Sequence, residues 1–216
     1  MLANCAIHSA ISCRRIQRVL DDSRGATLGI TFTRKTKRVL ARGKQAAVIN
    51  LQRDCAMAAL TDPTPAMVSF EQAIRDGHIK VRKAALDSAV VFYADQVPSG
   101  ASRFAYARMN GPSVIAFANF VSNGHIDRIP VFQVGVAVPQ AERGKGRAKH
   151  IMAVGIAELK HGLSRAHPGA EFFVEAVVGL DNLPSQNVAA GVLSARPKPI
   201  TDEISGLRAL HYIRKL

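Results

Sequence analysis

Cysteines are few in this sequence and long apolar runs are absent, and each shortage excludes a class of protein. The three cysteines, Cys5, Cys13 and Cys55, form no C-x-x-C pair, and their odd number argues against a disulfide framework. No apolar stretch is long enough to cross a bilayer. The N-terminus is apolar first and basic afterwards, which is the reverse of a secretory signal. The sequence therefore predicts a cytoplasmic protein that has no membrane partner.

Several familiar motifs are missing as well. The sequence has no internal repeat, no heptad pattern and no zinc-finger spacing, and its histidines lack the spacing of metal ligands. It contains neither the G-x-x-x-x-G-K-[ST] loop of nucleotide-binding proteins nor the dinucleotide fingerprint G-x-G-x-x-G. We therefore predict no metal site, and no nucleotide site of these two types.

Acidic residues are scarce beside the basic ones. The sequence has 16 Asp and Glu against 29 Lys and Arg, for a formal net charge of +13. The excess is large in residues 1–60, which hold 11 basic and three acidic residues, with the densest basic run at residues 34–44. Such a segment is typical of contact with nucleic acid or another acidic partner, although a solvated helical face has the same composition. Both interpretations stay open at this point.

Length and composition predict one globular domain with an extension. A hydrophobic content of 48% and a charged content of 21% provide enough apolar residues for a core in 216 residues. We expect residues 1–24 to form a basic amphipathic extension with a helix at residues 7–20. Residues 25–216 would form the domain, beginning with a strand at residues 26–33. The sequence leaves the number of subunits open, with a dimer as one option.

The most informative stretch is residues 131–162. Its first eight residues, VFQVGVAV, are apolar and rich in β-branched side chains, which predicts a buried strand that Pro139 ends. A basic glycine loop follows, with the sequence RGKGRA at residues 143–148. Apolar residues then recur at helical spacing and predict one buried helix face: Ile151, Met152, Gly155, Ile156, Leu159 and Leu163.

A strand, a glycine loop and a helix in this order suit the binding of an anion. The first turn of a helix leaves backbone N–H groups unpaired, and the helix dipole is positive there. Gly144 and Gly146 lack the Cβ atoms that would keep a phosphate from the backbone, and the neighbouring Arg and Lys residues add positive charge. An ordinary solvated loop with basic residues at its rim has the same local sequence, so the loop alone does not decide between the two.

Two motifs in order carry a resemblance to a known family. The glycine loop has the spacing R-x-x-G-x-A and lies between a predicted strand and a predicted helix. The next predicted strand, at residues 171–178, is followed by Asn182 and Ser185 in the spacing N-x-x-S. With both motifs present, residues 103–216 resemble the GCN5-related N-acetyltransferase (GNAT) superfamily, whose members bind acetyl-coenzyme A (acetyl-CoA).

The resemblance implies an α/β (α+β) fold. The central sheet would be mixed and mostly antiparallel, splayed between its fourth and fifth strands and flanked by helices. The sequence predicts matching strands at residues 103–109 and 113–121, followed by a turn at residues 122–125. The strands at residues 191–195 and 207–215 would pair at the other edge. Upstream, we expect a helix from Ser69 to Asp76, whereas residues 81–93 suit either a helix or a strand.

The resemblance also implies where acetyl-CoA would bind. Its pyrophosphate is expected on the glycine loop, at Arg143, Gly144, Lys145, Gly146, Arg147 and Ala148. Its pantetheine arm is expected at the backbone of Val136, Ala137 and Val138, and at Asn182 and Ser185. The implied reaction is direct attack of a primary amine on the acetyl thioester. It needs a base for the amine proton, a backbone N–H for the charge on the thioester oxygen and an acid for the thiolate.

Candidate catalytic residues are proposed with one departure from the family pattern. Many relatives have a tyrosine acid shortly after the N-x-x-S segment, where this sequence has Ala189 and Ala190. Ser185 and Tyr212 are therefore the candidate acids. Glu175, alone in an apolar strand, is the candidate base, because burial raises the pKa of a carboxyl group. The structural alternatives are a first-turn helix residue for Ser185, a sheet residue for Tyr212 and a solvent-facing or arginine-paired carboxylate for Glu175.

The acceptor stays open at this stage. A protein or peptide amine, a small amine and an aminoacyl-tRNA are all compatible, and Asp202 and Glu203 are the candidates to hold a cationic acceptor. Two other functions also stay open. One is a basic nucleic-acid-binding protein that contacts phosphates through residues 34–44 and the glycine loop. The other is a catalytically weak binding protein with the same fold.

Overall fold

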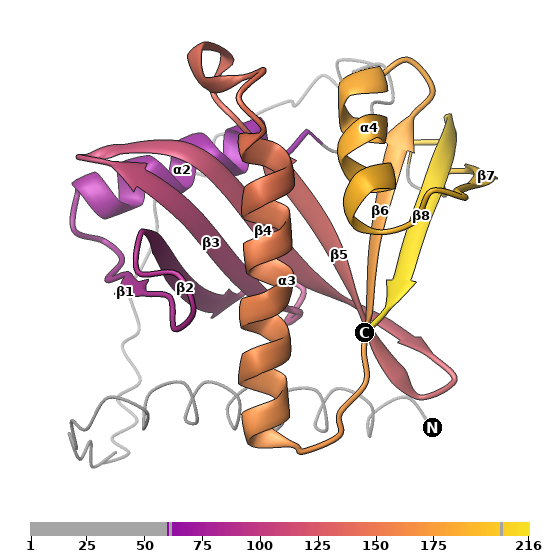
Figure 1. The fold of residues 1–216 in the computed structure, drawn as a ribbon, viewed down its shortest axis with the longest axis horizontal. Helices are drawn as coiled ribbons and strands as arrows, with labels where there is room; N and C mark the ends of the chain where they lie inside the picture. Colours follow the sequence, from indigo (N-terminus) through magenta and orange to yellow (C-terminus); the bar gives the residue numbers. More distant parts are fainter. Residues whose placement is uncertain (1–59, 61, 204) are drawn as a thin grey trace, which may run out of the picture.

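The computed structural model describes residue 60, residues 62–203 and residues 205–216 (Figure 1). In chain order the elements are α2 (Thr64–Arg75), β1 (Arg82–Lys83), β2 (Val90–Gln96), β3 (Ser102–Asn110), β4 (Ser113–Ile126), β5 (Ile129–Ala137), the short helix η1 (Gln140–Glu142), α3 (Arg147–Ala166), β6 (Phe173–Gly179), α4 (Leu183–Val192), β7 (Lys198–Thr201) and β8 (Arg208–Lys215). The predicted extension at residues 1–24, the predicted strand at residues 26–33 and the basic run at residues 34–44 lie outside the described residues. Within the described ranges, no helix is long and apolar enough to cross a membrane.

The strands of the described residues form one sheet in the order β1-β2-β3-β4-β5-β6-β8-β7. Every neighbouring pair is antiparallel except β5 and β6, which run parallel. The parallel ladder has only the pairs Val131↔Phe173, Phe132↔Val174 and Gln133↔Glu175. Beyond Gln133 the two strands diverge, as Figure 1 shows. The sheet therefore consists of two halves that a short ladder joins at one end.

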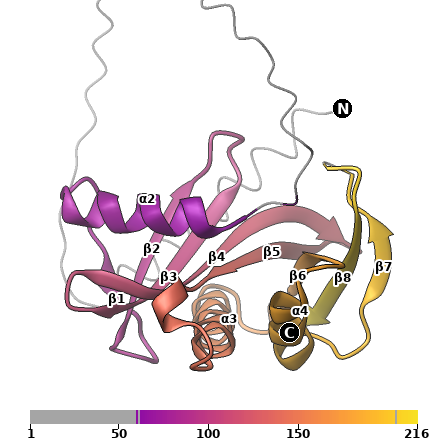
Figure 2. The same cartoon turned by 90° about the horizontal axis from the view of Figure 1, so that it is seen from above.

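The predicted fold class is confirmed. The sheet is mixed and mostly antiparallel, and helices cover both faces, with α2 on one face and α3 and α4 on the other (Figure 2). The splay lies between β5 and β6 rather than between the fourth and fifth strands. This shift has a simple cause, because the two-residue edge strand β1 precedes the longer strands and moves the count by one.

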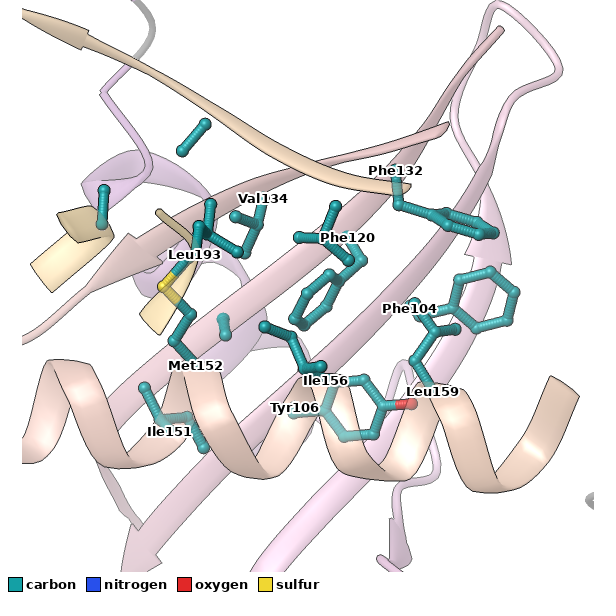
Figure 3. Close-up of a cluster of buried hydrophobic side chains, with 14 of the residues drawn as sticks. Phe104, Tyr106, Phe120, Phe132, Val134, Ile151, Met152, Ile156, Leu159 and Leu193 are labelled. Carbon is teal, nitrogen blue, oxygen red and sulfur yellow. The ribbon is translucent and has the colours of Figure 1, made fainter. Parts of the chain in front are cut away.

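The larger apolar core lies between α3 and the sheet. The helix buries the whole predicted stripe: Ile151, Met152, Gly155, Ile156, Leu159 and Leu163. Figure 3 shows Ile156 and Leu159 over the rings of Phe104, Tyr106 and Phe120 from β3 and β4. The helix comes close to the sheet at Gly155, where an added Cβ atom would lie 2.6 Å from Cε2 of Phe120. A glycine at this position is therefore a packing requirement.

A second, smaller core lies on the opposite face of the sheet. Met67 and Phe70 of α2 pack against Phe117 of β4 and Ala137 of β5. The rings of Phe70 and Phe117 have centroids 5.2 Å apart and are tilted by 46°. This cluster fixes the start of α2 beside β5, which places the segment before α2 at the edge of the splay.

The predicted start of the first described helix is wrong. The sequence predicted a helix from Ser69, whereas α2 begins earlier, at Thr64. Pro63 is the N-cap residue and a further proline lies in the first turn, where a missing N–H leaves no hydrogen bond unmade, so the prolines start the helix rather than delay it. The Asp62 side chain accepts the Thr64 N–H at 2.8 Å. The ambiguous stretch at residues 81–93 contains β1 and the start of β2.

The predicted turn at residues 122–125 is also wrong. β4 continues through this segment to Ile126, with an irregularity in its pairing to β5 between Ser122 and His125. The turn follows at Asp127 and Arg128, whose φ angles are +49° and +68°. A bulge absorbs Gly124, so the polar residues that indicated a turn lie in a bent strand.

The strand predicted at residues 191–195 belongs instead to the end of α4 and its C-cap, Leu193. The strand that pairs with β8 is β7, which begins later, at Lys198. The alanine-rich segment before residue 191 continues as a helix because Asn182 caps its N-terminus. The prediction of a strand at residues 207–215 is confirmed by β8.

The packing at Gly155 gives a test of the core. Gly155→Ala places a methyl group against the Phe120 ring, and overpacking of this kind costs about 1–3 kcal/mol. That cost exceeds the gain of about 1 kcal/mol that alanine has over glycine inside a helix. We expect the free energy of unfolding, measured by urea denaturation, to fall.

Gly191→Ala in α4 is the matched control. A Cβ atom there meets only the flexible end of the Lys149 side chain, at 3.2 Å. We expect this variant to be as stable as the wild type or more stable. Equal behaviour of the two variants would contradict the packing assigned to Gly155.

Candidate active site

A cavity of about 650 Å³ opens where β5 and β6 separate. Its walls come from β5, β6, the first turns of α4, the start of α3 and the segment just before α2. Most of the lining is apolar, with a few polar side chains at its edges. Among the described residues, no group of three or more His, Cys, Asp and Glu side chains is arranged to hold a metal ion.

The cavity passes through the sheet. Side chains alternate along a strand, so Val134 and Val178 point to the face of α3 and α4, with which they form one apolar cluster. Gly135 and Val177 therefore face the side of α2, and a Cβ atom added to Gly135 would lie 3.2 Å from Pro63. Residues of both sets line the cavity. A molecule can thus enter the gap from either face of the sheet.

The glycine loop lies at the N-terminus of α3, as predicted. Gly146 is the N-cap residue with a φ of +73°, and Gly144 has a φ of +76°, so both have the left-handed conformation that glycine adopts without strain. A Cβ atom built on either would have no heavy atom within 4 Å. The space over the loop is open, and the first turn of α3 directs unpaired N–H groups and its positive dipole there. This geometry suits a phosphate group.

Internal contacts hold the cations of this loop. Arg143 donates from Nε to the carbonyl oxygen of Val138 at 3.2 Å. Lys145 and Arg147 both pair with the carboxylate of Glu142. The hydrogen bond from Lys145, together with the one from Arg147, holds the pKa of Glu142 below its usual range. The region before the N-terminus of α3 therefore carries three positive charges and one negative charge.

The three residues that were predicted on β5 lie in different surroundings. Val136 lines the cavity, but Ala137 is buried against α2, and the carbonyl of Val138 is engaged by Arg143. The cavity is lined instead by residues 134–136. They follow Gln133, where the parallel ladder ends, so that the β6-facing edge of β5 has no partner strand from this point. The sequence predicts where a strand ends, but it does not predict the residue at which two paired strands separate.

The N-x-x-S segment is the start of α4. The side chain of Asn182 caps the helix by accepting the N–H of Ser185 at 3.1 Å. Both residues also line the cavity, and their contact with a pantetheine arm stays a prediction. The two interpretations of Ser185 are compatible, because the cap uses its backbone and leaves its hydroxyl group outside that contact. Ala189, which stands where many relatives have tyrosine, lines the cavity too and brings no hydroxyl group.

Glu175 is buried as predicted, but the expected rise of its pKa is wrong. Asn123 donates from Nδ2 to Oε1 at 2.6 Å, and Nε2 of His211 lies 2.8 Å from Oε2. Burial by itself raises the pKa of Glu175, but the hydrogen bonds from His211 and Asn123 outweigh it and hold the pKa below its usual range. Glu175 belongs to the last pair of the β5–β6 ladder and precedes the cavity-lining Ala176.

Tyr212 lies in the apolar core. Its side chain is 2% exposed and belongs to the cluster under α3 and α4. Burial raises the pKa of its hydroxyl group. It pairs with Ala176 in the β6–β8 ladder but does not itself line the cavity. The structure therefore does not bring Tyr212 and Ser185 together there, which supports the alternative of a sheet residue.

The acidic pair proposed for a cationic acceptor also lies apart from the cavity lining. Oδ2 of Asp202 accepts the backbone N–H and the hydroxyl of Ser205 at 2.8 and 2.7 Å. Asp202 thus closes its own loop between β7 and β8. Glu203, beside it, is exposed. Leu207, at the other end of the same loop, does line the cavity.

Two carboxylates that sequence reasoning missed do line the cavity. Asp181 directly precedes the cap of α4, and its Oδ1 would lie 2.9 Å from a Cβ atom added to Gly179. Gly179 and Val177 share one face of β6, so Asp181 lies on the side of α2. Its place next to the N-x-x-S segment was the available signal.

The second missed carboxylate, Asp62, comes from the segment before α2. Hydrogen bonds from Thr64 and the nearby charge of Arg143 hold the pKa of Asp62 below its usual range. Nothing in the local sequence connects Asp62 with the splay, because the contact depends on how α2 packs on β4 and β5. The α2 side of the cavity therefore carries two negative charges, opposite in sign to the glycine loop.

No family model and no curated protein matches the sequence. Similar solved structures include a GNAT-family acetyltransferase from Streptococcus pneumoniae, with 7% identity and a TM-score of 0.40 over 53% of this chain and 66% of that one. RimJ from Mycobacterium smegmatis, in complex with CoA-disulfide, has 14% identity and a TM-score of 0.43 over 70% and 60%. A ribosomal-protein-S5-alanine acetyltransferase from Vibrio fischeri has 18% identity and a TM-score of 0.38 over 54% and 61%.

The chain spans 66%, 60% and 61% of the length of these three structures. At such scores and identities, the likeness says nothing about activity or substrate. The fold rests on the strand order, the single parallel pair and the splay after Gln133. The resemblance to the GNAT superfamily implied a mixed, mostly antiparallel and splayed sheet flanked by helices, and that expectation of fold is confirmed.

Proposed function

We propose that the protein is an acetyl-CoA-dependent N-acetyltransferase that transfers the acetyl group to a primary amine of a peptide, protein or small molecule. The observation that carries the proposal is the cavity through the splayed sheet, with an anion-binding loop beside it on the α3 side. A donor that lies against α3 and α4 and an acceptor that approaches beside α2 would meet in the gap between β5 and β6. The order of the two sequence motifs supports the same assignment.

The residues around the splay fit acetyl-CoA, which supplies an activated acetyl thioester. The glycine loop would hold the pyrophosphate with the free N–H groups of α3 and with Arg143, Lys145 and Arg147. The β6-facing edge of β5 beyond Gln133 offers backbone groups for the amides of the pantetheine arm. Asn182 would contact the same arm from the opposite wall.

The chain supplies the remaining chemistry from groups along the gap. A backbone N–H of residues 134–136 would stabilise negative charge on the thioester oxygen, which is the role of a preorganised donor. Ser185 lines the cavity and is the proposed source of the proton for the departing thiolate. Tyr212 takes no part in this scheme, because it lies in the core.

The α2 side of the cavity favours a cationic amine joined to an apolar group. Asp62 and Asp181 provide negative charge there, and Leu60 and Leu207 provide apolar surface. The ammonium form of an amine is attracted to such carboxylates. A phosphate-rich acceptor such as tRNA would meet like charge at this entrance. The alternative of nucleic-acid binding rests on the glycine loop and on residues 34–44, and the latter lie outside the described residues.

Calorimetric titration with acetyl-CoA tests the cofactor half of the proposal. We expect saturable binding by the wild type. Gly146→Asp should weaken binding by about tenfold or more, because a carboxylate at the helix N-terminus opposes the pyrophosphate.

The matched control is Gly146→Asn, which has the same size and tolerates the left-handed conformation equally well but has no charge. It should lose less affinity than the aspartate variant. A folded wild type that binds no acetyl-CoA would remove the proposed function.

The acceptor half is tested by Asp181→Asn. With phenethylamine as the acceptor, we expect the KM for the amine to rise by about three- to tenfold, because one of the two carboxylates near the ammonium group is neutralised. The affinity for acetyl-CoA should not change. Glu171→Gln, which removes an exposed carboxylate before β6, is the control and should leave both constants as they are. An unchanged KM for the amine in Asp181→Asn would show that the acceptor does not bind beside Asp181.

A further inference from the structure

The pair of His211 and Glu175 lies at the closed end of the splay, on the side from which the acceptor would approach. Glu175, Val177 and Gly179 share one face of β6, opposite to the face packed under α3 and α4. His211 stands directly across from Val177 in the β6–β8 ladder, so their Cβ atoms are about 4.5–5.5 Å apart. Val177 lines the cavity. The imidazole is thus the neighbour of a cavity wall.

The contacts of Glu175 make it a poor proton acceptor. Oε1 already accepts from Asn123 and Oε2 is bonded to His211. Its side chain is 10% exposed, whereas that of His211 is 21% exposed. A base must be reachable by the group that it deprotonates. His211 is not itself a lining residue of the cavity, but its ring is the more exposed of the two and stands beside the lining residue Val177, so the amine would reach it directly or through one water.

The same contact fixes the tautomer of the neutral imidazole. An ionised carboxylate can only accept hydrogen bonds, so Nε2 of His211 must carry the hydrogen that points to Oε2 of Glu175. The lone pair of the neutral ring is then on Nδ1. A carboxylate that holds one ring nitrogen as a donor leaves the other free to take a proton, and it stabilises the imidazolium that results.

We propose that Nδ1 of His211 accepts the proton of the acceptor amine and that Glu175 is the positioning residue of this base; the proposal rests on the proposed function. The acceptor ammonium gives one proton to Nδ1. The amine nitrogen then forms the C–N bond with the acetyl carbon as the C–S bond breaks, and the thiolate leaves with the electron pair. Ser185 gives its hydroxyl proton to the thiolate and takes the second proton of the nitrogen in return, and the imidazolium returns its proton to water.

The charged groups that face His211 from neighbouring strands are Glu175 on β6 and Lys198, its partner in the β7–β8 ladder. Of these two, only Glu175 contacts the ring, and it holds Nε2 as the hydrogen-bond donor. Removing the carboxylate should release the tautomer of the neutral imidazole, and this gives a readout that a purely structural contact would not move.

His211→Gln separates the catalytic role from a structural one. Glutamine can still donate to Oε2 of Glu175, so it preserves the contact, but it has no nitrogen that accepts a proton at neutral pH. With phenethylamine and acetyl-CoA, measured as thiol release, kcat should fall by about 100-fold or more while calorimetric affinity for acetyl-CoA is unchanged. In Glu175→Gln kcat should fall as well, and the neutral ring of His211 should no longer carry its hydrogen on Nε2 alone.

Nitrogen NMR of the histidines in the free protein adds a measurement that needs no acceptor. We expect neutral His211 to carry its hydrogen on Nε2. A hydrogen on Nδ1, or a kcat within threefold of the wild type in His211→Gln, would overturn the inference alone. A wild type that binds no acetyl-CoA, or that binds it and releases no thiol with the amine, would instead overturn the proposed function and the inference with it.

Discussion

The architecture of the described chain depends on the early end of the ladder between β5 and β6. β4 and β5 stay paired as far as Ala137, and β6 and β8 as far as Gly179, but the two halves share only three pairs. A gap between strands exposes backbone groups and apolar side chains, so the closed end must be held firmly. Glu175 does this, because it accepts hydrogen bonds from Asn123 in one half and His211 in the other. The edge-to-face rings of Phe132 and Phe172 add an apolar tie nearby.

Opening the sheet in this way divides one cavity between two chemical environments. Side chains alternate along β5 and β6, so Val134 and Val178 point to the face covered by α3 and α4. Gly135 and Val177 point to the other face, where the segment before α2 lies. The glycine loop gives the first side its positive charge. Asp62 and Asp181 give the second side its negative charge. On the proposed function, an anionic donor would be attracted to the glycine loop and a cationic acceptor to the two carboxylates.

Local patterns predicted the parts of this arrangement that local forces determine. The buried stripe of α3 and the glycine loop both depend on residues within a few positions of one another, and the structure has both. The cap at Asn182 is equally local but was not predicted. The partners of Glu175 lie 52 and 36 residues away, and no period or spacing connects them. The prediction for its pKa therefore included burial and missed the hydrogen bonds that reverse the shift. The position of Asp62 at the cavity could not be predicted either, because it too depends on residues far away in the sequence.

Glu142 shows how the charge of the glycine loop is balanced before a ligand arrives. Three cations within five residues would repel one another, and Glu142 reduces that repulsion by pairing with Lys145 and Arg147. The Lys145 side chain is exposed, and such surface pairs contribute little. The pair of Arg147 and Glu142 is partly buried and is the firmer of the two. Neither pair uses the backbone N–H groups at the start of α3, so the internal carboxylate balances the loop charge and leaves these donors to an external anion.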